Sequence, residues 1–168
     1  NGSGVVTAAG FGKIGQVKNV TKRDAVTTSS TSYSDVTGMS LAITPTTTTS
    51  KILVSMHCSI IGSPDSTLHY FRVLRGTSTI SDLTNDQGGN ADTQGALMAV
   101  GGADFNPQDR QVDNLNFSYL DSPASTSEQT YKLQFKSGSS ADTLHFNKWS
   151  IDNNKSGVAT ITLMEVLP

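Results

Sequence analysis

Apolar and polar residues alternate along most of this 168-residue chain, and this period of two constrains its fold more than any other feature. Between Lys51 and Gly62 one phase is apolar and the other is mostly polar. The apolar phase consists of Ile52, Val54, Met56, Cys58 and Ile60. The segments Leu115–Tyr119 and Tyr131–Phe135 repeat the pattern. Because successive side chains of a strand point to opposite faces, the alternation indicates strands with one buried face.

Further segments with the composition of strands lie around these three, and turn sequences such as Gly62-Ser63-Pro64-Asp65 separate them. They cover residues 14–21, 36–44, 68–75, 97–100, 144–149 and 158–167. No segment of the sequence carries an apolar stripe at helical spacing over three turns. Many short strands at near-regular intervals are typical of a sandwich or a closed barrel. We therefore expect an all-β fold, an antiparallel two-sheet sandwich with less than about 10% helix.

The last expected strand, Val158 to Leu167, is apolar on both phases. Ile161 and Leu163 occupy one phase, and Met164 and Val166 occupy the other. Such a strand lies in the middle of a sheet, or it faces the core on one side and a neighbouring subunit on the other. The sequence does not distinguish these alternatives.

Charge is scarce in this chain: 15% of the residues are charged, against roughly 25% in typical soluble domains. With a net charge of -2 and no basic stripe, no nucleic acid is expected as a partner. No apolar run approaches the roughly 18 residues that a membrane span needs, so no membrane insertion is expected. Cys58 is the single cysteine, so packing and strand pairing must hold the fold together without an intrachain disulfide.

Two stretches lack the character of strands. Residues 1–12 are rich in glycine and alanine and are interpreted as a linker or the end of a stalk, which leaves residues 13–168 as one folded domain. The stretch from Asp82 to Asp113 contains two Gly-Gly pairs and only a short apolar island. Connections of this length are usually functional loops or flexible ones.

A few residues could carry chemistry, and each also has a structural interpretation. Cys58 lies in mid-strand on the apolar phase, where an inert buried thiol is expected rather than a catalytic one. The three histidines are His57, His69 and His145, and none has ligand spacing to another. Neighbouring strands could bring His57 and His69 together around a metal, but we expect the histidines to lie on polar surface faces.

A group of oxygen-bearing side chains lies in the glycine-rich stretch, and it comprises Asp82, Asn85, Asp86, Asn90 and Asp92. Ca²⁺ takes such ligands, although the spacing of an EF-hand loop is absent, and a plain solvated loop is the expected interpretation. The chain has no GxSxG, HExxH or P-loop motif. We therefore expect no catalytic residues, no bound metal, no cofactor and no enzyme activity, with a glycan-degrading fibre domain as the remaining enzyme hypothesis.

Several short motifs follow one another in a characteristic order along the chain. They are VTGMSL at 36–41, SKILV at 50–54, FRVLRG at 71–76, YLDSP at 119–123, TYKLQ at 130–134 and ITLMEV at 161–166. Their order resembles that of phage tail-fibre and virion head domains found in marine and cyanobacterial phages, over roughly Ile14 to Val166. The resemblance implies a jelly roll of TNF/C1q-like type that assembles as a homotrimer on the virion surface.

Two functions are compatible with this resemblance. The first is a fibre or receptor-binding head domain that attaches a phage to a host surface glycan or protein, where three weak sites on one rigid head raise the avidity. The alternative is a capsid decoration or cement protein that contacts the capsid protein and stabilises the shell. Both functions use the same sandwich, so the fold alone does not decide between them.

Two sets of residues are expected to make the contacts of such a module. The trimer axis is expected to be lined by apolar residues of the last strand and its neighbours, namely Tyr131, Phe135, Ile161 and Leu163. The contact with the host or the shell is expected in the long loop, at Phe105, Asn106, Gln108, Asp109 and Arg110. An aromatic face can stack on a sugar, while amides and carboxylates bind its hydroxyls. The structural alternative is that Phe105 packs on its own domain.

Overall fold

The fold is built from strands. The computed structural model describes residues 12–63, 68–80, 98–100, 111–148 and 157–168, and within these residues it has eleven strands and no helix. The strands are β1 (Lys13–Lys22), β2 (Val26–Thr28), β3 (Ser34–Ile43), β4 (Lys51–Ser63), β5 (His69–Arg75), β6 (Ser78–Thr79), β7 (Met98–Val100), β8 (Gln111–Asp121), β9 (Gln129–Ser137), β10 (Leu144–Phe146) and β11 (Ala159–Leu167). The same residues contain no helix that is long and apolar enough to cross a membrane.

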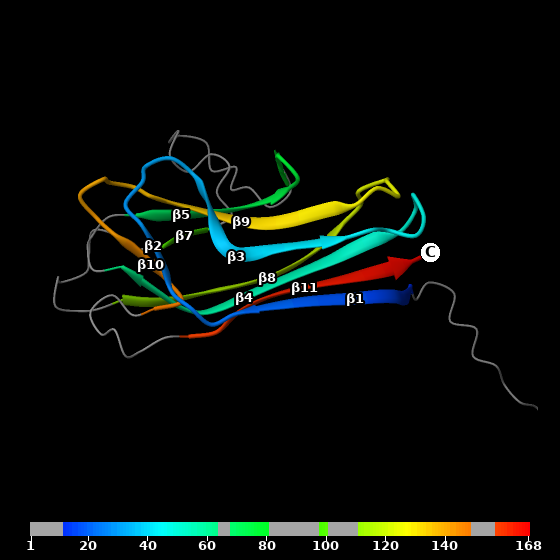
Figure 1. Cartoon of the computed structure of the whole chain (residues 1–168), viewed down its shortest axis with the longest axis horizontal. Helices are drawn as coiled ribbons and strands as arrows, with labels where there is room; N and C mark the ends of the chain where they lie inside the picture. Colours follow the sequence, from blue (N-terminus) through cyan, green and yellow to red (C-terminus); the bar gives the residue numbers. More distant parts are fainter. Residues whose placement is uncertain (1–11, 64–67, 81–97, 101–110, 149–156) are drawn as a thin grey trace, which may run out of the picture.

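The strands form two antiparallel sheets that lie face to face as the two layers of a sandwich (Figure 1). Sheet A has the order β1-β11-β4-β10-β2, and β8 also pairs with β4. Sheet B has the order β3-β9-β5-β6, and β7 also pairs with β5. The chain repeatedly crosses from one layer to the other, for example from β3 to β4 and on to β5, as in a jelly roll. The expected fold class, an antiparallel two-sheet jelly-roll sandwich, is therefore confirmed.

The core lies between the two sheets and takes one side-chain phase from each long strand. In β4 the apolar phase from Ile52 to Cys58 is buried, as the alternation in the sequence predicts. Near the centre, the ring of Phe71 on β5 lies 6.5 Å from the ring of Phe135 on β9 and 6.1 Å from that of Phe146 on β10, measured between centroids. Cys58 is buried and forms no disulfide, which agrees with its structural interpretation.

The histidines do not all lie where the sequence suggests. His57 is exposed on sheet A, as expected, and His145 is half-buried. The expectation is wrong for His69, whose side chain is fully buried at the start of β5. Both side-chain phases of β5 are mostly buried, so neither of its faces is fully open to solvent. His57 and His69 belong to different sheets and are not on neighbouring strands.

Glu165 is a fully buried carboxylate on the inward phase of β11. Its Oε1 accepts hydrogen bonds from the Thr46 backbone N–H at 2.6 Å and from the Thr46 hydroxyl at 2.7 Å, and its Oε2 accepts one from Gln16 Nε2 at 2.8 Å. Burial raises the pKa of Glu165, but these bonds and one from Ser50 outweigh burial and lower it to about 2. The carboxylate therefore ties β11 to β1 and to the loop between β3 and β4.

Because of His69 and Glu165, we expect the free energy of unfolding to fall in two steps as the pH decreases. Burial lowers the pKa of His69 from 6.5 to about 4, so the unfolded chain takes up this proton first and stability is lost between these values. The pKa of Glu165 is lowered from 4.5 to about 2, so its contribution is present above pH 4.5 and is lost as the pH falls towards 2. Each step should amount to about 1–2 kcal/mol, allowing for screening at the ends of the sandwich.

Urea unfolding measured from pH 7 to pH 2 tests both steps. The variant His69→Gln should lack the step between pH 6.5 and 4, and Glu165→Gln should lack the acidic one. His57→Gln is the matched control, because its side chain is exposed, and its profile should follow that of the wild type. A wild-type profile that is flat over the whole range would contradict the prediction.

Candidate functional site

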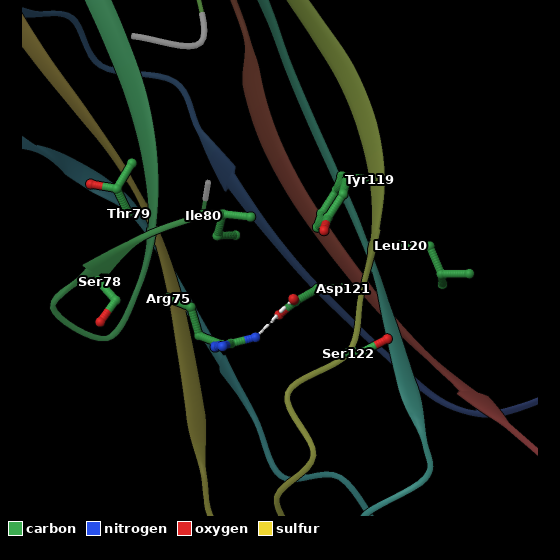
Figure 2. A pocket seen from close by; sticks show the side chains of 8 residues that line it. All are labelled: Arg75, Ser78, Thr79, Ile80, Tyr119, Leu120, Asp121 and Ser122. Atoms are coloured by element: carbon green, nitrogen blue, oxygen red, sulfur yellow. Dashed lines mark hydrogen bonds and ion pairs between the residues drawn. The ribbon is translucent and has the colours of Figure 1, made fainter. Parts of the chain in front are cut away.

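A pocket of about 380 Å³ opens between the two sheets, where β8 of sheet A faces the β5–β6 hairpin of sheet B (Figure 2). It is lined by Arg75, Ser78, Thr79, Ile80, Tyr119, Leu120, Asp121 and Ser122. Within the described residues β8 pairs only with β4 and β6 only with β5. The two strands are therefore edges, and the sandwich is open between them. The volume of the pocket lies within the range of ~300–1,000 Å³ that small-molecule sites generally have.

An ion pair between Arg75 and Asp121 bridges the two sheets at this pocket. Arg75 Nη1 lies 2.7 Å from Oδ1 and 2.6 Å from Oδ2 of Asp121, and the Tyr131 hydroxyl donates to Oδ2 at 2.6 Å. The Asp121 side chain is 7% exposed and that of Arg75 is 32% exposed. Register explains the arrangement, because Arg75 pairs with Tyr131 in sheet B and Asp121 points inward from the end of β8.

The electrostatics of this bridge keep it charged. Burial lowers the pKa of Arg75, but the hydrogen bond and the charge of Asp121 outweigh burial and raise it above its ordinary value. Burial raises the pKa of Tyr131, and its bond to the Asp121 carboxylate raises it further. Tyr131 therefore remains a neutral hydrogen-bond donor and Arg75 a cation, so the three groups form one stable network rather than a proton-transfer site.

The rest of the pocket combines hydroxyls with an apolar wall. Ser78 and Thr79 come from β6, and Ser122 follows β8 (Figure 2). In this view Tyr119 and Ile80 lie above the Arg75–Asp121 pair, Ser78 lies to its left and Ser122 to its right, and Leu120 points away from the space (Figure 2). None of the described residues that line the pocket is a histidine or a cysteine. Such a site can hold a ligand through hydrogen bonds and ring contact, but it offers no nucleophile with a base beside it.

A second feature is the outer face of sheet A, where strand register aligns three rows of four side chains across β1, β11, β4 and β8. The first row is apolar and contains Val17, Met164, Leu53 and Leu120. The second row contains Asn19, Thr162, Ser55 and Ser118. The third row contains Thr21, Thr160, His57 and Asn116. None of these side chains is an aspartate, glutamate, lysine or arginine, so the face carries hydroxyls, amides and an apolar strip.

The apolar row is exposed at its two ends in the single chain, and Met164 and Leu53 between them are half-buried. Val17 is 56% exposed and Leu120 is 43% exposed, and Ile14 beside Val166 extends the strip at 46% exposure. Within the polar rows some side chains already form hydrogen bonds with one another. Asn19 Nδ2 donates to the Thr162 hydroxyl at 2.8 Å, and the hydroxyls of Ser55 and Ser118 are 2.8 Å apart. A contiguous exposed apolar strip rimmed by polar groups is typical of an interaction surface.

The residues that the sequence suggested for the trimer axis lie elsewhere. The core of a single chain buries all four of these side chains fully or almost fully: Tyr131, Phe135, Ile161 and Leu163. A side chain enclosed between the two sheets cannot also contact a second chain, so this prediction is corrected. On β11 the phase that points out of the sandwich holds Met164 and Val166 instead.

The other expected sites fall outside the described residues. This applies to the contact loop with Phe105, Asn106, Gln108, Asp109 and Arg110, to the oxygen cluster at 82–92, and to the linker at 1–11. The described residues contain no group of three or more side chains placed to hold a metal ion. The pocket at Arg75 was missed by the sequence analysis. Its one local signal is Asp121, an acidic residue that follows Leu115, Phe117 and Tyr119 on the same phase of β8.

Comparison with known proteins adds no family assignment. No protein-family model matches the chain, and no curated protein is significantly similar to it. The fold itself is shared by proteins of many functions. Function must therefore be argued from the pocket and from the outer face of sheet A.

Proposed function

We propose that this domain is the head of a phage fibre, a homotrimeric attachment module that contacts the host surface. The observation that carries the proposal is the outer face of sheet A, with its exposed apolar row and its two uncharged polar rows. This surface has the properties of an interface between copies of the same chain. The trimeric state and the phage fibre come from the resemblance of the sequence motifs, with which this face agrees.

The chemistry of the face favours a second copy of this chain as its partner. Around a rotation axis each residue comes close to its own copies, so any charged side chain near the axis would meet the same charge. The three rows contain no aspartate, glutamate, lysine or arginine and avoid this repulsion, and Lys51 lies beside Val166 at the end of the face. Hydroxyls and amides both donate and accept hydrogen bonds, so their rows can pair with an identical surface. The apolar row supplies area that association removes from water.

The outer face of sheet B differs sharply from this surface. Lys132 Nζ lies 2.9 Å from Asp35, and Gln134 donates to the same carboxylate at 2.6 Å. Arg72 donates to Gln134 at 2.8 Å, and its guanidinium lies 4.1 Å from the centre of the Tyr33 ring. A surface with such solvated ion pairs is typical of an exposed face. The contrast between the two sheets therefore supports sheet A as the side that faces the other subunits.

Two measurements test the proposal. Light scattering at micromolar concentration should give about three times 17.7 kDa, and a stable monomer would refute the assembly. Electron microscopy of virions labelled with antibody against this chain should place the label at the end of a fibre. Label distributed over the shell would instead support a decoration protein, and virions without label would refute a virion function altogether.

A further inference from the structure

We infer that the pocket between β8 and the β5–β6 hairpin binds a neutral saccharide. The inference deepens the proposed attachment function, on which it rests, by naming the class of ligand and the place where it binds. It uses described residues only, and it moves the expected sugar contact from the long loop to the open edge of the sandwich.

The charge of the pocket favours a neutral ligand over an anionic one. Arg75 is the only cationic side chain among the described residues that line it, and both oxygens of Asp121 already lie within 2.7 Å of it. Asp121 also accepts a hydrogen bond from Tyr131, so it is held in place from two sides. A carboxylate or phosphate at the guanidinium would lie next to this buried carboxylate and be repelled by it. A hydroxyl group meets no such repulsion.

The hydrogen-bonding groups of the pocket match the hydroxyls of a sugar. Arg75 uses only Nη1 for its bonds to Asp121, and a guanidinium carries further N–H donors on Nε and Nη2. Ser78, Thr79 and Ser122 are among the residues that line the same pocket (Figure 2), and hydroxyls can both donate and accept hydrogen bonds. Adjacent hydroxyls of a pyranose need this combination of donors and acceptors.

The apolar wall and the rigidity of the site complete the match. Tyr119 is among the lining residues, and an aromatic ring can stack on the C–H side of a pyranose. The lining residues sit on strands or next to them, and the Arg75–Asp121 bridge holds the two edges together, so the site exists before a ligand binds. An open site of this size binds weakly, and three copies on one head would compensate through avidity.

Saturation-transfer NMR on the wild-type protein tests the inference, with methyl glycosides of glucose, galactose, mannose and N-acetylglucosamine as probes. At least one of them should show binding at millimolar concentration. The double variant Ser78→Ala/Thr79→Val removes two hydroxyls from the pocket with little change in volume, and should weaken that binding at least about fivefold. The matched control Ser34→Ala/Thr37→Val removes the same groups from the exposed side of β3 and should bind as the wild type does.

Three outcomes would overturn the inference: no signal from any probe, equal binding by the pocket variant and the wild type, or binding of inorganic phosphate in competition with the sugar. Light scattering on the same samples separates this result from the assembly. A trimer that binds no sugar refutes the ligand but leaves the proposed head domain intact. A monomer that binds sugar through Ser78 and Thr79 refutes the trimer but leaves the pocket intact.

Discussion

Replacing Met164 with aspartate should convert the assembled protein into a folded monomer of 17.7 kDa. Met164 lies in the apolar row of sheet A, paired with Val17 on one side and Leu53 on the other. In an assembly that covers this row, each subunit would bury a carboxylate without a partner, at a cost of several kcal/mol per copy. Association should weaken by at least about a hundredfold, which light scattering at micromolar concentration detects.

Two further variants make this result interpretable. Leu120→Asp changes the same row on the edge strand β8, where the side chain is 43% exposed, so it tests the face with little risk to folding. Thr37→Asp places the same charge on the exposed side of β3 in sheet B and should leave the mass unchanged. Circular dichroism should show a β-rich spectrum for all three proteins. If both sheet A variants keep the mass of the wild type, the outer face of sheet A is not the interface.

Replacing Phe71 with alanine should reduce the free energy of unfolding by about 3–5 kcal/mol. Its ring is fully buried and contacts the rings of Phe135 and Phe146, so the substitution leaves a cavity where sheets A and B meet. For a domain of this size each kcal/mol corresponds to roughly 2–4 °C in Tm, so Tm should fall by about 6–20 °C.

The measurement is best made in the Met164→Asp background, because the Tm of an assembly also depends on protein concentration. Leu68→Ala is the matched control: Leu68 comes just before β5 and is 38% exposed, so its loss should change stability by no more than about 0.5 kcal/mol. A loss below about 1 kcal/mol for Phe71→Ala would show that the three rings do not form the centre of the core.

The alternation of side chains predicted the strands and their buried phases well, because it is a local property. The inward phases of β4 and β9 follow it directly, from Ile52 to Cys58 and from Tyr131 to Phe135. In β11 both phases are apolar, so the sequence could not tell which one faces the core. Only the pairing of Ile161 with Met56 and of Leu163 with Val54 decides that question.

The pocket could not be found from the sequence, because it depends on distant pairing. Arg75 and Asp121 are far apart in the chain, and the register of two different sheets brings them together. His69 was misplaced for a similar reason: a histidine at the start of a strand carries no local sign that both side-chain phases of β5 are mostly buried. The alternation of apolar and polar residues does not determine the register between strands that are far apart in the sequence.

The position of β11 between β1 and β4 also has a consequence for the order in which the chain can fold. β1 is the first described strand to be synthesised, and within the described residues it pairs only with β11, the last of them. β1 therefore has no partner in its sheet while the intervening chain is being made, and sheet A closes only when β11 enters between β1 and β4. Contacts of such high sequence separation slow folding and leave β1 and the open edge of β4 exposed during synthesis.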